Sequence, residues 1–390
     1  MVQLSRLEDL QKAFKEFLES CRKRGRVVVI PAVNVDSIAA ASILAKCLSK
    51  SGLDVVVNFN PRNEHRDPVL FLDLRSEVKQ LSLSLIYGSG VSVLHGQRMV
   101  AYTNSSIAST ILYLAKDVCE LTHIEKACAL VGGVDRGKDL GKEGFRGIEG
   151  DIAAELIEEG VIIEEVGLRL WGWKKKSLAE MLSNTLTPFI PQLSGLSNSA
   201  VKFLKDVGVS KPEEATVGDL EREDLFKKLA KELIAKATES SKRKRDAVEF
   251  IGKLYGMQVN NEVVYIHEIY GAFIVAISLG RDLLNNLLYL TEDYWSLQSL
   301  LLLFKQLVSR VANEVSKNYS NYSSSLPIST GLIKRPELYV RVLSDSGLLE
   351  GRPVVLYDSA VNRKYTSLME AIRTGLAVNE VDSEQLVEVK

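Results

Sequence analysis

The feature that most constrains the fold is a short apolar run followed directly by a helical segment. Residues 26–33, RVVVIPAV, have the β-branched composition of a strand that is buried on both faces. Residues 38–52 are rich in helix formers and end in a glycine, and residues 54–59 have the composition of a second strand. A strand, a helix and a strand in this order predict a parallel sheet, since parallel strands need a crossover connection.

Later segments continue this alternation. We expect further strands at 68–74, 91–95 and 127–134 and a helix at 105–118. From about residue 151 to 236 the pattern is mainly helical. Toward the C-terminus a mixed pattern returns, with strands expected at 336–343 and 352–360 and a helix at 365–375.

Together these elements predict an α/β protein in two parts. Residues 1–245 are expected to form a doubly wound parallel sheet with a helical extension, and residues 246–390 a smaller C-terminal α/β domain. With 390 residues, of which 46% are hydrophobic, the chain is long and apolar enough to bury large cores.

Charge and cysteine content limit the class of function. A net charge of −1 gives no overall attraction to nucleic acid or anionic membranes, so any DNA contact must come from local basic patches. The N-terminal segment lacks the apolar core of a signal peptide, and charged or polar residues interrupt the apolar stretches at 263–279 and 297–308. The four cysteines contain no C-x-x-C pair, which argues against a zinc site and a disulfide framework. We therefore expect a reduced, cytoplasmic protein.

Polar side chains follow several of the predicted strands, where sites form in parallel α/β sheets. They are Asn34, Asp36, Asp73, His95 and Asp135. Converging carboxylates and an imidazole suit divalent cations, and two such ions can clamp the oxygens of a phosphodiester displacement. The alternative for each aspartate alone is a helix cap or a turn residue.

The order and spacing of these segments resemble the DHH phosphoesterase family, especially RecJ-like nucleases. The first-strand motif of that family, His-x-Asp-x-Asp-Gly, falls here on Ala32, Asn34, Asp36 and Ser37. The family's later aspartates match Asp73 and Asp135, and its Asp-His-His signature falls best on Val93, Leu94 and His95. The resemblance implies a DHH-type domain and a DHHA1-like C-terminal domain, although the Gly-Gly-Gly-His motif of active relatives is absent.

Too few ligands remain in this remnant site for two-metal hydrolysis. At most three carboxylates are retained, and Asn34 keeps hydrogen-bonding capacity without the negative charge that holds a cation. We therefore expect no catalytic residue and no cofactor beyond a residual Mn or Mg ion. The competing hypothesis is a manganese-dependent single-strand exonuclease or oligonucleotide phosphodiesterase. A third is an unrelated α/β protein whose aspartates are only caps.

Two segments resemble more particular relatives. VNVDSIAAASIL, at 33–44, is similar to the opening motif of the CDC45 family, whose DHH site is similarly eroded. Residues 186–209 resemble the segment that follows the DHH core in archaeal RecJ-like proteins. These resemblances imply a non-catalytic archaeal subunit of the replicative CMG helicase, with GINS and MCM as partners.

Basic residues beside aromatic ones offer a candidate contact with single-stranded DNA. The residues singled out are Trp173, Lys174, Lys175, Lys176, Arg243 and Arg245. Cations and indole rings in this arrangement suit phosphates and stacked bases. The alternative is a solvated surface run, with the tryptophans packed under the helical region.

Overall fold

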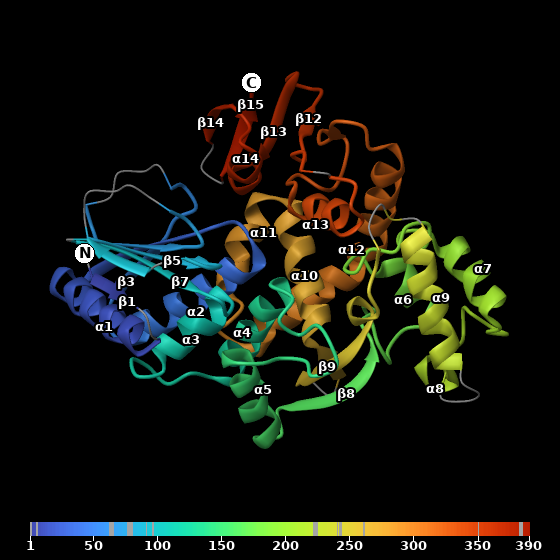
Figure 1. Cartoon of the computed structure of the whole chain (residues 1–390), viewed down its shortest axis with the longest axis horizontal. Helices are drawn as coiled ribbons and strands as arrows, with labels where there is room; N and C mark the ends of the chain where they lie inside the picture. Colours follow the sequence, from blue (N-terminus) through green and yellow to red (C-terminus); the bar gives the residue numbers. More distant parts are fainter. Residues whose placement is uncertain are drawn as a thin grey trace.

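The computed structural model describes residues 2–4, 7–61, 66–75, 81–90, 92–95, 97–220, 225–239, 241, 244–259, 262–349, 351–381 and 385–390. Figure 1 shows an N-terminal sheet with helices beneath it, a helical part on the opposite side of the molecule, and a small C-terminal sheet above both. No helix of the described residues is long and apolar enough to cross a membrane.

The N-terminal sheet has seven strands in the order β1-β6-β7-β5-β4-β2-β3. Five of them, β3, β2, β4, β5 and β7, are parallel, and β6 and β1 continue the sheet in antiparallel pairing. The predicted parallel α/β sheet is therefore confirmed. The strands are β1 (Val2–Leu4), β2 (Arg26–Pro31), β3 (Asp54–Val57), β4 (Val69–Leu72), β5 (Ser82–Tyr87), β6 (Ser92–His95) and β7 (Arg98–Thr103).

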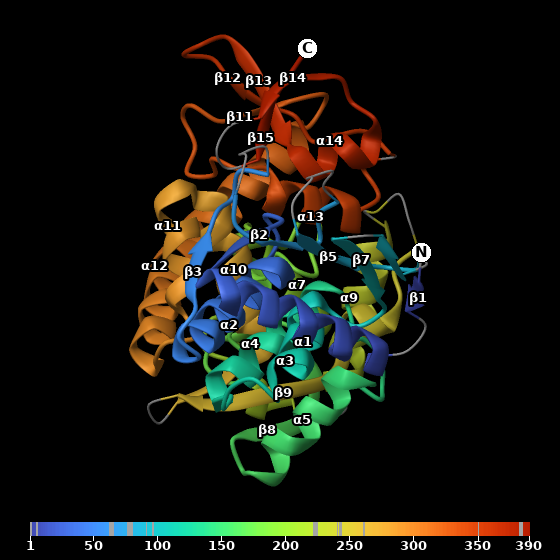
Figure 2. The same cartoon turned by 90° about the vertical axis from the view of Figure 1, so that its left-hand side faces the viewer.

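Alternating side chains of the central strands enter two different cores. Val27 and Val29 pack in one large core with helices α1 (Leu7–Arg24), α2 (Val35–Lys50), α3 (Ile107–Ala115) and α4 (His123–Asp135). Val28 and Ile30 point to the opposite face, where Met369 from the C-terminal part packs against them. These four helices thus cover one face of the sheet, as the two views show (Figures 1 and 2).

The strand predicted at 127–134 is wrong, because this segment lies within helix α4. Thr122 and Glu125 form a capping box at the start of α4, which fixes a helical rather than an extended start. Gly132 permits the close approach of α4 to its neighbours, since a Cβ atom there would lie 2.6 Å from Asp36 Oδ1. A short apolar run with two glycines does not separate a buried strand from a buried helix by its pattern alone.

Helices dominate the middle of the chain, as predicted, and they surround a second core that includes Leu168, Leu204 and Leu233. A three-stranded antiparallel sheet, β10-β9-β8, joins this part to the rest. Its strands come from both sides of the predicted boundary at 245, which stays a prediction. The elements are α5 (Ile148–Glu158), β8 (Ile162–Leu168), α6 (Leu178–Asn184), α7 (Ser197–Val207), α8 (Val217–Leu220), α9 (Leu225–Glu239), η1 (Ala247–Glu249), β9 (Ile251–Val259) and β10 (Glu262–Tyr265).

The C-terminal part begins with long helices and ends in a five-stranded sheet of order β11-β12-β13-β15-β14. Residues 336–343, predicted as a strand, lie mainly in helix α13, whose buried Leu338, Tyr339, Val342 and Leu343 follow a helical spacing. The elements are α10 (Ile266–Leu279), α11 (Arg281–Asn286), η2 (Leu287–Tyr289), α12 (Tyr294–Asn321), β11 (Leu326–Pro327), α13 (Glu337–Asp345), β12 (Leu356–Asp358), β13 (Arg363–Ser367), α14 (Leu368–Thr374), β14 (Val378–Val381) and β15 (Leu386–Val389).

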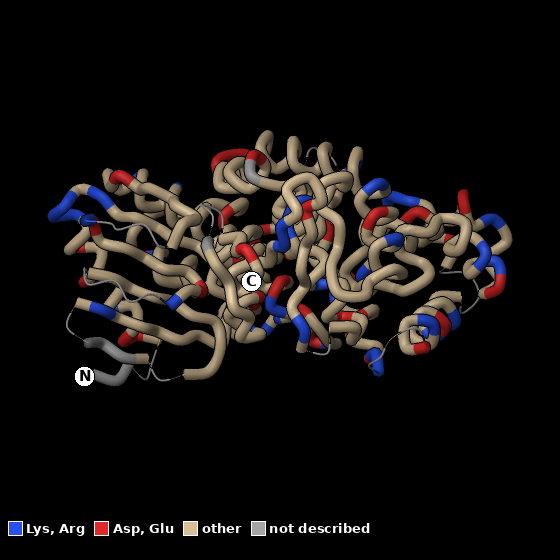
Figure 3. The backbone as a smooth tube through the Cα atoms, turned by 90° about the horizontal axis from the view of Figure 1, so that it is seen from above, with Lys and Arg blue, Asp and Glu red and all other residues tan. Residues whose placement is uncertain are grey.

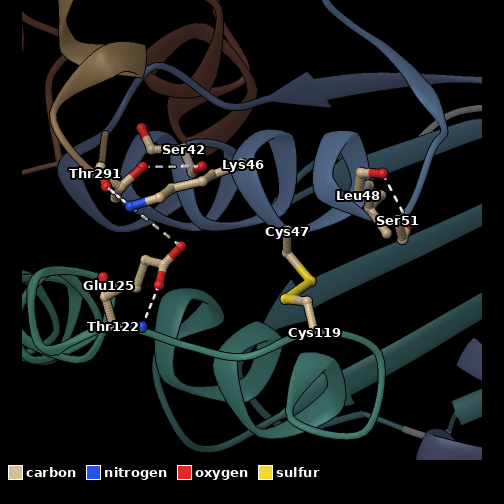
Figure 4. Close-up of a disulfide and its surroundings, with 9 residues drawn as sticks. All are labelled: Ser42, Lys46, Cys47, Leu48, Ser51, Cys119, Thr122, Glu125 and Thr291. Atoms are coloured by element: carbon tan, nitrogen blue, oxygen red, sulfur yellow. Dashed lines mark hydrogen bonds and ion pairs between the residues drawn. A yellow bond between two sulfur atoms is a disulfide. The ribbon is translucent and has the colours of Figure 1, made fainter. Parts of the chain in front are cut away.

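A disulfide links Cys47 near the end of α2 to Cys119 in the loop after α3 (Figure 4). The expectation of a fully reduced protein without disulfides is therefore wrong for this pair. The two cysteines are 72 residues apart in sequence, and only the packing of α2 against α3 brings their Cα atoms to 5.6 Å. Cys21 and Cys128 are buried free thiols.

Candidate functional site

The predicted polar residues meet where β2 and β4 end. The parallel strands have the order β3-β2-β4-β5-β7, so the crossovers from β2 leave toward β3 and later chain returns at β4. Such a switch point is where ligands bind in open α/β sheets. Asn34 and Asp36 follow β2, and Asp73 follows β4, as the sequence predicts.

Asn34 performs two structural tasks at this edge. Its Oδ1 accepts a hydrogen bond of 2.8 Å from the Ser37 backbone N–H and so caps helix α2. Its Nδ2 donates to Asp73 Oδ2 over 3.2 Å. A second carboxylate at position 34 would face Asp73 with like charge, so the amide suits the present arrangement.

Asp36 is fully buried and connects three helices. Its oxygens accept hydrogen bonds of 2.9 and 2.8 Å from the backbone N–H groups of Ile107 and Ala108, which start helix α3. The Asp36 backbone N–H in turn donates to Asp135 Oδ2, at the end of α4, over 3.3 Å. A carboxylate at a helix N-terminus satisfies N–H groups that have no partner within the helix.

Arg136 brings its guanidinium between the two buried carboxylates. Nε lies 2.7 Å from Asp36 Oδ2, and Nη2 lies 2.6 Å from Asp73 Oδ2. Its Cζ lies 4.4 Å from the centroid of the Tyr87 ring, which covers one face of the guanidinium. The side chain is 17% exposed, so this ion-paired cluster is largely desolvated.

Electrostatics follow from this burial. Desolvation raises the pKa of Asp36 to about 6, although Arg136 and the hydrogen bond from Ala108 oppose the rise. Burial alone would lower the pKa of Arg136, but Asp36, Asp73 and Asp135 outweigh it and raise that pKa above its usual value. Arg136 therefore stays charged and neutralises the aspartates at neutral pH.

Asp135, at the end of α4, faces the C-terminal part of the chain. Arg341 of α13 donates to the backbone oxygen of Asp135 over 3.3 Å. A groove of about 380 Å³ opens between the switch point and helices α10, α13 and α14. Asn34, Asp73, Asp135 and Arg136 line one wall, and Arg341 contributes to the other.

The donor set does not fit a catalytic metal centre. Asp36 and Asp73 direct their Oδ2 atoms at Arg136, and their Oδ1 atoms accept backbone hydrogen bonds. The cation that balances these carboxylates is therefore the guanidinium. Within the described residues, no group of three His, Cys, Asp or Glu side chains is arranged to hold a metal ion.

The structure separates His95 from this cluster. The His95 backbone pairs with Arg98, at the amino end of β7, whereas the site lies at the carboxyl ends of the parallel strands. Its placement in the remnant site is therefore wrong, because β6 runs antiparallel to β7. The parallel strand β7 does reach the site's edge, and it is followed by Asn104 and Ser105, which offer neither a carboxylate nor an imidazole.

The predicted nucleic-acid residues at 173–176 are held within the protein. Trp173 is only 2% exposed, and its Nε1 donates to Glu165 Oε1 over 2.9 Å. Each of the three lysines forms an ion pair; the partners of Lys174, Lys175 and Lys176 are Glu165, Glu268 and Glu180. Stacking of a base on Trp173 would require this packing to open, and DNA contact by the lysines stays a prediction.

The other predicted DNA contacts divide into one buried and one that lies outside the described residues. Arg245 is 2% exposed, pairs with Glu249 and donates to the backbone oxygen of Asp345. Arg243 lies outside the described residues. Seen from above, basic and acidic residues are interspersed along the chain and no single face gathers one sign (Figure 3).

Sequence reasoning missed Arg136 and Arg341. Arg136 immediately follows the retained Asp135, and a cation next to a presumed metal ligand is a signal that the ligand is balanced internally. Arg341 lies more than two hundred residues from Asp135 in sequence, so no local signal identifies their contact.

Comparisons with models of known protein families and with curated proteins find no match. Among solved structures, the chain is similar to CDC45 from Entamoeba histolytica, with a TM-score of 0.61, 13% identity and coverage of 97% of this chain and 96% of that one. RecJ from Thermus thermophilus in complex with Mn²⁺ gives a TM-score of 0.46 at 13% identity, covering 97% of this chain and 51% of that one. An exonuclease RecJ bound to manganese gives 0.45 at 14% identity, covering 95% and 86%. Over nearly its whole length, this chain has the fold of CDC45.

Proposed function

We propose that this chain is a non-catalytic DNA replication factor, a RecJ-like subunit of the CDC45 type that associates with GINS and MCM in the replicative helicase and binds single-stranded DNA. The observation that carries the non-catalytic part is the position of Arg136. Its guanidinium bonds the two aspartates that a RecJ-like enzyme would use for metal, 2.7 and 2.6 Å away. The fold likeness to CDC45 supports the replication role.

The charge balance explains why the remnant aspartates tolerate the loss of metal. Two buried carboxylates without a cation would repel each other and lack solvation. Arg136 supplies the opposite charge from the end of α4, and Tyr87 shields it. The arrangement is compact and fixed, as expected of a framework that holds surfaces in place and performs no chemistry.

The first experiment tests association and cleavage on one preparation. The purified chain is mixed with GINS of the same organism and analysed by size-exclusion chromatography. The same sample is incubated with Mn²⁺ and a labelled single-stranded oligonucleotide. We expect a stable complex and an intact oligonucleotide. The replication role fails if no complex forms, and the non-catalytic role fails if cleavage occurs and Asp135→Asn abolishes it.

A second experiment asks whether the guanidinium blocks metal directly. Isothermal titration with Mn²⁺ compares the native protein with Arg136→Ala, which frees oxygens of Asp36 and Asp73 beside Asp135. We expect no uptake by the native chain and measurable uptake by the variant. Equal, saturable uptake by both would contradict the proposal, since Arg136 would then not occupy the ion's place.

A further inference from the structure

Outside the remnant site, exposed apolar side chains gather in one short segment. Tyr289, Tyr294, Trp295 and Leu302 are 56, 39, 72 and 59% exposed. Among the described residues, no other segment of similar length exposes as many large apolar side chains. Single exposed apolar residues are ordinary, but a cluster of this kind marks an interaction site.

These side chains border an apolar groove. The groove has a volume of about 330 Å³ and lies between η2 and the first turns of α12. Its lining is mostly leucine, including Leu287, Leu290 and Leu300, and exposed Tyr289 contributes to its wall. In Figure 2, α11 and α12 lie together at one side of the molecule, away from the N-terminal sheet.

The exposed ridge of α12 runs along this groove. Trp295, Ser299 and Leu302 have the spacing i, i+4 and i+7, which places them on one helical stripe. Ser299 also lines the groove, so the stripe and the groove form one continuous surface. Trp295 and Leu302 are about 10 Å apart along the axis at 1.5 Å per residue, which matches two turns of a partner helix.

The charges around this surface are all of one sign. Between 282 and 303 every charged residue is acidic, namely Asp282, Glu292 and Asp293, and all three are exposed. Lys46 approaches from α2, where the carbonyl oxygen of Thr291 and the carboxylate of Glu125 bind its ammonium (Figure 4). The rim therefore presents net negative charge to an incoming partner.

We infer that this surface, formed by η2 and residues 294–303 of α12, is a docking site for an amphipathic helix of a partner protein, with an apolar face and lysine or arginine along its flanks. Leucine-sized side chains of that helix fill the groove, and Trp295 and Leu302 pack against the neighbouring turns. Its basic flanks face Asp282, Glu292 and Asp293. The site is independent of the remnant aspartates.

Trp295 supplies a built-in reporter. The chain has three tryptophans, and the other two, Trp171 and Trp173, are each 2% exposed. The probe is a fourteen-residue helical peptide of leucine and lysine with its leucines on one face. We expect it to shift Trp295 emission to shorter wavelength and to reduce acrylamide quenching several-fold. A peptide of the same composition with scattered leucines, and one with glutamate in place of lysine, are expected to bind at least tenfold more weakly.

Matched variants decide the location. Leu302→Lys is expected to weaken peptide binding at least tenfold, while Val166→Lys, which changes a 70% exposed residue on β8, leaves it unchanged. Both are surface changes, and circular dichroism verifies that each variant is folded. The inference is overturned if the two variants bind alike, if the glutamate peptide binds as well as the lysine peptide, or if Trp295 emission shifts with protein concentration alone, which would identify a second copy of this chain as the occupant.

Discussion

Replacing Arg136 with methionine tests the internal ion pair directly. The change keeps much of the aliphatic volume but removes the charge that contacts Asp36 and Asp73 at 2.7 and 2.6 Å. Asp36 is fully buried and Asp73 is 9% exposed, so water cannot replace the lost partner. Removing one member of a buried ion pair costs about 3 to 5 kcal/mol, because the other charge remains uncompensated. We expect a loss of that size in the free energy of unfolding at pH 7.5.

The loss should depend on pH in a defined direction. The native pKa of Asp36 is about 6, above the value of 3.8 for a free aspartate, so the native state holds this proton more tightly than the unfolded chain. Stability from this group is therefore full below about pH 4 and is lost as the pH rises through 6. Without Arg136 the native pKa rises further. The difference between native protein and variant should thus be larger at pH 7.5 than at pH 5, where Asp36 is protonated in the variant.

Urea titrations followed by circular dichroism at both pH values measure this difference. Arg146→Met is the matched control, because Arg146 forms an exposed pair with Glu143 and its loss should cost under about 1 kcal/mol. The double variant Asp36→Asn with Arg136→Met should regain part of the stability lost by the single change. A loss below about 1 kcal/mol for Arg136→Met, or the same loss at both pH values, would refute the proposed charge balance.

Two further predictions concern packing around α2. Cys47→Ser should lower stability by up to about 4 kcal/mol in the chain-entropy estimate for a loop of this length, and reductant should destabilise the native protein but not the variant in thermal scans; equal responses to reductant would contradict the bond to Cys119. Gly132→Ala should cost about 1 to 3 kcal/mol despite the better helix propensity of alanine, because its Cβ would lie 2.6 Å from Asp36 Oδ1. Gly218→Ala, with no atom nearer than 3.7 Å, is its control in the same urea titration, and equal stabilities would contradict the close approach.

The sequence predicts the first strand, helix and second strand well because two independent signals agree there. The run at 26–33 is β-branched, and Asn34 stands where a helix cap is expected; the structure has β2, an Asn34 cap and α2 at these positions. The strand ends then bring Asn34, Asp36 and Asp73 together through topology alone. Asp135 joins them for a different reason than expected, since it ends a helix and not a strand.

The failures arise where pattern gives no unique answer. The apolar run at 127–134 fits a strand or a helix, and the decisive signal was the capping box of Thr122 and Glu125 just before it. His95 was placed by spacing, but β6 is antiparallel, so its end lies at the other edge of the sheet. The disulfide joins segments 72 residues apart, and pairing at that distance depends on the tertiary fold.

The retained aspartates have structural roles that are sufficient to explain their presence. Asp36 binds the N-terminus of α3, and Asp73 accepts from the backbone of Tyr87 and from Asn34. Removing either would leave backbone donors unsatisfied in a buried place, at about 1 to 3 kcal/mol per group. Once Arg136 balances their charge, the same residues are held in place by stability without any metal. Aspartates at these positions in a RecJ-like chain therefore do not by themselves indicate nuclease activity; the residue that follows Asp135 carries the stronger information.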